Sequence, residues 1–250
     1  IGWCDWSSDV CSSDLEKFQN LVINNFSETK QQATKEEKHS FYLFVDALRY
    51  EMAREYVSLL DKRGFKVGCT HLFAALPTLT STAKVKSSPV AEEVNTTSEI
   101  NDFTPFFKTG KPANITNFRA ELENKGYMHS IKKGFDPERS YWVEIGNIDT
   151  RGHEEQSEML KRADELFDEI SEVIDTAIEA GVREMKIVTD HGWLMLPGGL
   201  PSAKIVKDLT IARCGRCAYI KEGVKTNLTH LPWEWNPSVY IGYAPDISFF

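Results

Sequence analysis

The chain has 250 residues, a formal net charge of −8 at pH 7, and 41% hydrophobic and 26% charged residues. This length and composition are typical of a soluble globular protein with one large α/β domain or at most two small ones. The negative charge argues against a surface that binds nucleic acid by general electrostatics, although a local basic groove at a phosphate site stays open. No apolar run approaches the roughly 20 residues that a membrane-spanning helix needs, so we expect no membrane partner.

The first residues differ in character from everything that follows. Ile1–Leu15 has neither a helical nor a strand period and resembles translated sequencing-adapter sequence. It has neither the basic start nor the apolar core of a secretory leader, so we interpret it as non-native. Residues 16–39 then predict a short helix and a polar linker, which includes the Lys/Glu-rich segment Gln31–Lys38.

A strand and a helix are the first predicted elements of the main domain. Phe41–Asp46 is a continuous apolar run that ends in an aspartate, as expected for a buried parallel strand. Ala47–Arg63 has apolar residues on one helical face, and Gly64 lies where a C-terminal cap belongs. Phe65–Ala75 predicts a second strand, which leads into the turn Leu76–Thr82.

The middle of the chain combines a polar segment with short elements. Ser87–Thr116 is mostly polar and lacks a clear period, so we expect a long excursion over the active face. Asn117–Asn124 predicts a short helix and Tyr127–Ile131 a strand.

The clearest amphipathic helix is Glu154–Ala180, which by its length has about seven turns. It lies between the strand-like runs Tyr141–Ile145 and Met185–Thr189, and this order predicts a right-handed βαβ crossover. From Trp193 onward Gly and Pro are frequent and the apolar runs are short, which predicts antiparallel strands or a hairpin at the sheet edge. The chain stops at Phe250 inside an apolar run, which we interpret as a truncation.

The cysteines indicate a reducing compartment. Outside the first 15 residues only Cys69, Cys214 and Cys217 remain, an odd number without a disulfide framework, so we expect a cytoplasmic protein. Cys214 and Cys217 form one CxxC, which could be half of a zinc ribbon or a redox motif. Because no second CxxC completes a zinc site, we interpret them as small residues beside a turn.

Three of the predicted strands end at side chains that bind metals. Asp46 follows the first, Asp149 and His153 follow the second, and Asp190 and His191 follow the third. Residues just past the carboxyl ends of parallel strands converge on one crevice. Each motif alone could instead be a helix cap or a turn. Their joint occurrence at three strand ends favours a two-metal hydrolase.

A candidate nucleophile lies in the turn after Pro77. A hydroxyl has too high a pKa to attack phosphorus unaided, and coordination to a divalent metal lowers that pKa. Thr80 at a strand-to-helix turn would also have backbone N–H groups near phosphate oxygens. We interpret Thr78, Ser81 and Thr82 as ordinary turn residues, and we expect Gly192 to permit a sharp turn close to bound ligands.

The order of these motifs resembles that of the alkaline phosphatase superfamily. The segment Asp46-Ala-Leu-Arg-Tyr-Glu51 is similar to its PglZ-domain branch, and the other matching motifs are Leu76-Pro-Thr-Leu-Thr80, Asp149-xxx-His153 and Val188-Thr-Asp-His-Gly192. The resemblance covers residues 40–250. It implies a three-layer α/β/α sandwich with a mostly parallel central sheet, truncated at the C-terminus.

The same resemblance implies two divalent metal ions, Zn²⁺ first and Mn²⁺ as the alternative. The first ion would be held by Asp46, Thr80, Asp190 and His191. The second would be held by Asp149, His153 and a further late histidine. His230 is the only histidine after His191, and its surroundings in the sequence lack the expected His-Gly-Gly pattern. We therefore interpret His230 as a surface residue and the last ligand as lost by truncation.

The function implied by the resemblance is metal-dependent hydrolysis of phosphate esters through Thr80. PglZ proteins act in BREX-type phage defence, a cytoplasmic bacterial system with several partner proteins. Two alternatives stay open. One is a catalytically degenerate scaffold that binds defence partners, and the other is a metal-dependent nuclease.

Overall fold

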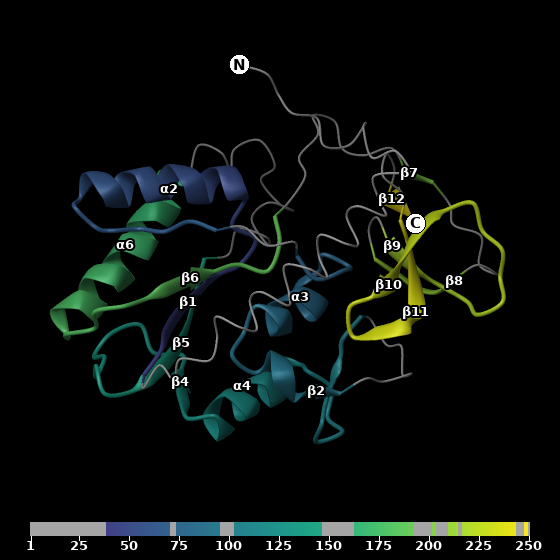
Figure 1. Ribbon diagram of the computed structural model, residues 1–250, viewed down its shortest axis with the longest axis horizontal. Coiled ribbons are helices and arrows are strands. Elements are labelled where there is room, and N and C mark those ends of the chain that lie inside the picture. Colours follow the sequence, from purple (N-terminus) through teal and green to yellow (C-terminus); the bar gives the residue numbers. More distant parts are fainter. Residues whose placement is uncertain are drawn as a thin grey trace, which may run out of the picture.

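The computed structural model describes residues 39–70, 74–95, 103–146, 163–192 and 217–243, and the backbone alone of 202–203, 210–214 and 248–249. The predictions for residues 1–38 lie outside this range. The described chain is a mixed α/β structure in which a parallel sheet lies between helices, and an antiparallel sheet lies beside it (Figure 1). None of the described helices is long and apolar enough to cross a membrane.

The parallel sheet has the strand order β4-β5-β1-β6. Its strands are β4 (Tyr127–His129), β5 (Ser140–Ile145), β1 (Phe41–Val45) and β6 (Lys186–Val188). All three pairings are parallel, so the strands end at the same edge of the sheet. The strands predicted from the runs at 41–46, 127–131, 141–145 and 185–189 are confirmed.

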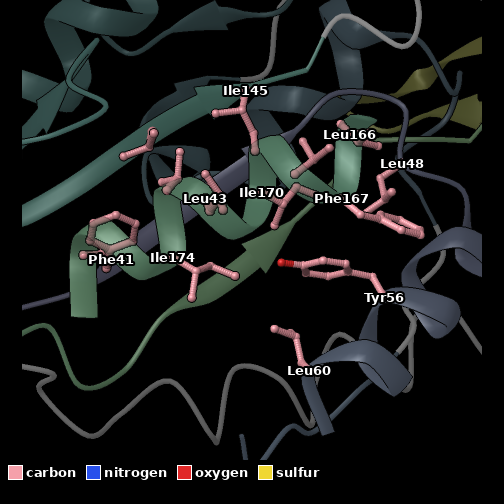
Figure 2. Close-up of a cluster of buried hydrophobic side chains, with 14 of the residues drawn as sticks. Phe41, Leu43, Leu48, Tyr56, Leu60, Ile145, Leu166, Phe167, Ile170 and Ile174 are labelled. Atoms are coloured by element: carbon pink, nitrogen blue, oxygen red, sulfur yellow. The ribbon is translucent and has the colours of Figure 1, made fainter. Parts of the chain in front are cut away.

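One face of the sheet is covered by two amphipathic helices, α2 (Tyr50–Lys62) and α6 (Ala163–Glu179). Alternate residues of β1, including Phe41 and Leu43, point to this face and pack against helix residues such as Ile170 (Figure 2). The predicted helices are confirmed for the described residues. Gly64 and Gly181 follow them with φ of 87° and 99°, as left-handed C-terminal caps require.

The opposite face is covered by α3 (Thr80–Lys86) and α4 (Ile115–Asn124). Between them in the chain lie the 3-10 helix η1 (Ala91–Glu93) and the antiparallel pair of β2 (Val94–Asn95) and β3 (Phe106–Phe107). Phe44 and Trp142 stack with ring centroids 5.3 Å apart on this face, and Phe118 of α4 packs against them. Helices therefore cover both faces.

Two of the predicted segments are wrong. Residues 65–70 and 74–75 are not strands, because β5 and β6 occupy both sides of β1. The apolar residues Phe65 and Val67 instead pack as irregular chain against the α2–α6 core. The described part of Ser87–Thr116 is not a polar excursion, since Val90 and Phe107 are buried under the sheet.

The helix predicted at 117–124 is present and begins at Ile115. The Asn114 side chain caps it by accepting a hydrogen bond from the Asn117 N–H at 3.0 Å.

The C-terminal strands form a sheet of their own. Its order is β10-β11-β9-β8, with β8 (Thr210–Cys214), β9 (Cys217–Ile220), β10 (Thr229–Trp233) and β11 (Asn236–Tyr243), all antiparallel. The prediction of antiparallel strands is confirmed, but they are not the edge of the parallel sheet. An apolar cluster that includes Phe103, Tyr219 and Trp233 lies between this sheet and α3. A further short parallel pair joins β7 (Ser202–Ala203) to β12 (Ser248–Phe249).

Candidate metal centre

The ends of β1 and β6 bring three possible ligands together. Phe44 lies opposite Val188 in the parallel pair, so Asp46 and Asp190, each two residues further on, come to the same edge. One ligand atom from each of Asp46, Asp190 and His191 lies within 4.8 Å of the others. The structure thus joins two of the three predicted strand-end motifs in a group that could hold a metal ion.

Asp190 is the most deeply buried member of this group, with no exposed side-chain surface. Its Oδ1 accepts hydrogen bonds from the backbone N–H groups of Ala47 at 3.2 Å and His191 at 2.9 Å. Its Oδ2 is also buried, and within the described chain no donor reaches it. A buried carboxylate oxygen without a hydrogen bond is unfavourable, and a bound cation would relieve that cost.

His191 presents one ring nitrogen to this carboxylate. Its Nδ1 lies 2.8 Å from the carbonyl oxygen of Gly192, and because a carbonyl only accepts, Nδ1 carries the proton. In the neutral ring Nε2 then has a free lone pair, which a metal ligand needs. Nε2 lies 3.6 Å from Asp190 Oδ2 and 3.0 Å from the hydroxyl of Thr80.

The turn after β1 shapes the edge of the site. Ala47 has a φ of 55°, and the N–H of Leu48 donates to Thr189 Oγ1 at 3.0 Å. The chain is therefore not helical at Ala47 and Leu48. The helix begins at Tyr50, with extended Arg49 as its N-cap residue. Asp46 is three residues before that cap, so the alternative that Asp46 is a helix cap does not hold.

Thr80 approaches Asp46, Asp190 and His191 from the face of the sheet that α3 and α4 cover. It is the first residue of α3, after the extended Leu79. Its hydroxyl can donate to the Nε2 lone pair of His191, from which it is 3.0 Å away. The nucleophile predicted from the sequence therefore contacts a predicted metal ligand.

The remaining predicted ligands are not part of this group. Asp149 and His153 lie outside the described residues. His230 is exposed on β10, with its ring 5.5 Å from that of Tyr240, as expected for a surface histidine. Cys214 lies opposite Cys217 in the antiparallel pair of β8 and β9, which agrees with their interpretation as residues beside a turn.

Gly192 does not need to be glycine. A Cβ built there would meet Arg49 Cγ at 3.6 Å and Arg49 Cα at 3.9 Å, both ordinary contacts, and its φ is not in the left-handed region. The described surroundings thus leave room for a side chain at position 192, and a turn close to bound ligands stays a prediction. Arg49, which lies beside Gly192, donates a hydrogen bond that lowers the pKa of the Glu51 carboxyl.

The sequence does not reveal the polar residues that surround α3. Lys84 pairs with Glu144 of β5 at 2.9 Å, and Glu144 also accepts a hydrogen bond from the indole of Trp142 at 2.9 Å. Thr82, interpreted as an ordinary turn residue, is fully buried and hydrogen-bonded. A single acid within an apolar strand was the available signal for Glu144, whereas Thr82 had none.

Comparison of the chain with protein-family models, with curated proteins and with solved structures finds no match. The assignment of a function therefore depends on the chemistry and geometry of this centre.

Proposed function

We propose that the chain is a metal-dependent hydrolase of phosphate esters with Thr80 as its nucleophile. The observation that carries this proposal is the contact of the Thr80 hydroxyl with His191 Nε2, next to a buried Asp190 oxygen that lacks a donor in the described chain. A hydroxyl, an imidazole and carboxylates at one sheet edge are the groups that such a reaction needs.

The side chains fit a divalent cation. Asp46 and Asp190 supply carboxylate oxygens, His191 supplies Nε2 and Thr80 its hydroxyl oxygen. This mixed oxygen and nitrogen set suits Zn²⁺ first and Mn²⁺ next. When bound, the cation would lower the pKa of the hydroxyl and offset negative charge on the phosphoryl group.

The protein contributes orientation. Asp190 joins the ends of β1 and β6 by accepting from Ala47 and His191, so the two strand ends keep one spacing. The Gly192 carbonyl fixes the tautomer of His191 and directs Nε2 at Thr80. The Thr80 hydroxyl would lose its proton to solvent water as its oxygen attacks phosphorus, and the ester oxygen would leave on the opposite side with the bonding electrons and take up a proton from water. Water would then hydrolyse the phosphothreonine.

The fold supports a closer assignment. A parallel sheet with helices on both faces and a site at its carboxyl edge agrees with an alkaline-phosphatase-like α/β/α sandwich of the PglZ type. On this proposal Asp149 and His153 complete a second metal site, and the protein works with BREX partners in the cytoplasm. The antiparallel C-terminal sheet is an addition to that core.

Metal binding tests the proposal directly. Calorimetric titration of the chelator-treated protein with Zn²⁺ and Mn²⁺ should show at least one tight site. His191→Gln should weaken it by more than about tenfold, because loss of an outer-shell partner alone already costs that much. His230→Gln is the matched control, because it removes an exposed imidazole from another sheet. Binding that is absent from the wild type, or equal in both variants, would contradict the proposed site and favour the scaffold alternative.

Substrate comparison separates the remaining alternatives. Aryl phosphate monoester, aryl phosphate diester and single-stranded DNA should be incubated with the metal-loaded protein. We expect hydrolysis of an aryl ester without cleavage of DNA, because the chain is acidic overall. Cleavage of DNA alone would favour the nuclease alternative.

A further inference from the structure

The helix that carries Thr80 is too short to hold its own position. α3 has seven residues, and its N-cap Leu79 provides no side-chain hydrogen bond. Isolated helices of this length are not stable in water, so the position of Thr80 depends on what packs against α3.

Three consecutive residues of the antiparallel sheet contact α3 and the segment before it. They form the end of β10 and the turn to β11, and we call them the tryptophan clamp: Trp233, Glu234 and Trp235. The indole N–H of Trp233 donates to Thr82 Oγ1 at 3.3 Å, and that of Trp235 donates to the Thr82 carbonyl at 3.1 Å.

Glu234 adds a contact at each end of this segment. Its carboxylate pairs with Lys86 Nζ at 2.6 Å, in the last turn of α3. Its backbone N–H donates to the carbonyl of Leu76 at 3.0 Å, four residues before Thr80. The clamp therefore holds the segment before, within and at the end of α3.

The clamp is itself fixed by buried aromatic packing. Trp233 is 1% exposed, and its ring lies edge-on to Tyr219 at 5.7 Å. Tyr219 stacks on Phe103 at 4.4 Å, and the Phe103 carbonyl accepts from Thr82 Oγ1 at 2.7 Å. Thr82 thus has a partner for both its donor and its acceptor.

Helix geometry links the clamp to the nucleophile. Residues two apart on a helix do not share a face, so Thr82 can be held by the clamp while Thr80 faces the strand ends. The Thr80 hydroxyl does so, at 3.0 Å from His191 Nε2. Any rotation or shift of α3 would change that distance.

We propose that Trp233, Glu234 and Trp235 are positioning residues, which hold α3 so that Thr80 stays in contact with His191. This inference rests on the proposed function for its catalytic meaning, since positioning matters only if Thr80 reacts. The role of the antiparallel sheet is then to position α3, because the clamp residues themselves are not metal ligands.

Hydrogen exchange of the metal-free protein tests the clamp independently of activity. Trp235→Phe keeps an aromatic ring and removes the indole donor. We expect the hydrogen-bonded amides of residues 82–86 to exchange about fivefold to tenfold faster, as loss of one hydrogen bond predicts. Those of β1 and β5 should not change. Tyr56→Phe is the matched control, because it removes one hydroxyl contact, to Ser171 at 2.9 Å, on the other face.

A second pair of variants guards against misfolding. Lys86→Met removes the ion pair with Glu234, and Lys86→Arg retains it, so exchange in α3 should rise in the first and return toward the wild-type rate in the second. If α3 exchanges at the wild-type rate in both Trp235→Phe and Lys86→Met, the positioning inference is wrong.

Kinetics then separate this inference from the proposed function. With an aryl phosphate, Trp235→Phe should lower kcat with little change in KM, because it disturbs the nucleophile and not the substrate contacts. An inactive wild type with faster α3 exchange in the variant contradicts the hydrolase proposal and still supports the clamp. An active wild type whose variant keeps full kcat contradicts the catalytic role of the clamp.

Discussion

The two faces of the parallel sheet are built from different kinds of contact. The face under α2 and α6 is a large apolar cluster, in which Tyr56 and Ser171 form a polar contact between the helices. The face under α3 and α4 combines a smaller apolar cluster with hydroxyl and charged side chains, among them Thr82, Lys84 and Glu144. The first face stabilises the sheet, and the second holds the residues from which we infer chemistry.

This difference explains how several buried polar groups are tolerated on the face that α3 and α4 cover. Each buried hydroxyl or charge is costly unless it is paired. Thr82 is paired with Phe103 and Trp233, and Lys84 with Glu144. Such directional bonds fix the angle of a short helix, which apolar packing alone does not.

The largest expected effect is on catalysis, at the second face. Thr80→Ala should lower kcat for an aryl phosphate by at least about 10³-fold and leave the melting temperature unchanged, because the side chain is half-buried and small. The matched control is Thr78→Ala, an exposed hydroxyl two residues away. Full activity of Thr80→Ala would remove Thr80 from the mechanism.

The next effect is on stability, at the first face. Ile170→Ala should lower the free energy of unfolding by about 2–5 kcal/mol, since Ile170 has no exposed surface. Zn²⁺ affinity of the folded variant should be unchanged. Urea denaturation and calorimetry measure the two quantities, and the exposed Leu59→Ala is the control. A parallel loss of Zn²⁺ affinity would show that the two faces are not separable.

The strands and the convergence of Asp46, Asp190 and His191 could be predicted because their signals are local. Phe41–Val45 is a continuous apolar run with an acid after it, and Lys186–Val188 is followed by an acid and a histidine. In a parallel sheet such ends meet whatever the intervening chain does. The pairing of β1 with β6 then places Asp46 beside Asp190.

The other elements could not be predicted because long-range contacts decide them. Phe65 and Val67 have strand-like composition, but the strand positions beside β1 are taken by β5 and β6. In the segment after Ser87, described buried side chains such as Val90 and Phe107 stand among polar residues, so the sequence shows no clear period there. The bond from Trp233 to Thr82 joins residues 151 positions apart, and no local pattern encodes it.

A smaller effect concerns the stability that the protein loses by burying the Asp190 carboxylate. Asp190→Asn keeps Oδ1 as an acceptor for Ala47 and His191 and replaces the buried oxygen that lacks a described donor. Without metal the variant should be as stable as the wild type or more stable by about 1 kcal/mol, because it buries no charge.

With Zn²⁺ at about a hundred times its Kd, the wild type should gain about 2.7 kcal/mol and the Asp190→Asn variant much less. Thermal melts with and without a chelator measure both terms. A metal-free variant that is clearly less stable than the wild type would mean that Asp190 is paired for structure, not for a cation.

The smallest effect lies at the rim of the second face, where Lys125 of the α4 C-cap pairs with Glu93 of η1 at 2.9 Å. The hydrogen bond from Lys125 lowers the pKa of Glu93 below its ordinary value of 4.5. A carboxyl pKa that is lower in the folded protein stabilises the fold at pH values above the unfolded pKa, and this stability is lost as the pH falls through the folded pKa.

Lys125→Met should therefore lower the free energy of unfolding at pH 6 by less than about 1 kcal/mol, and the difference should shrink below pH 4. Urea denaturation at several pH values measures this, with the exposed Lys66→Met as control. A stability difference that persists unchanged in acid would show that the Lys125 stem acts by packing. Charge pairs would then contribute less to the stability of the second face than its contacts indicate.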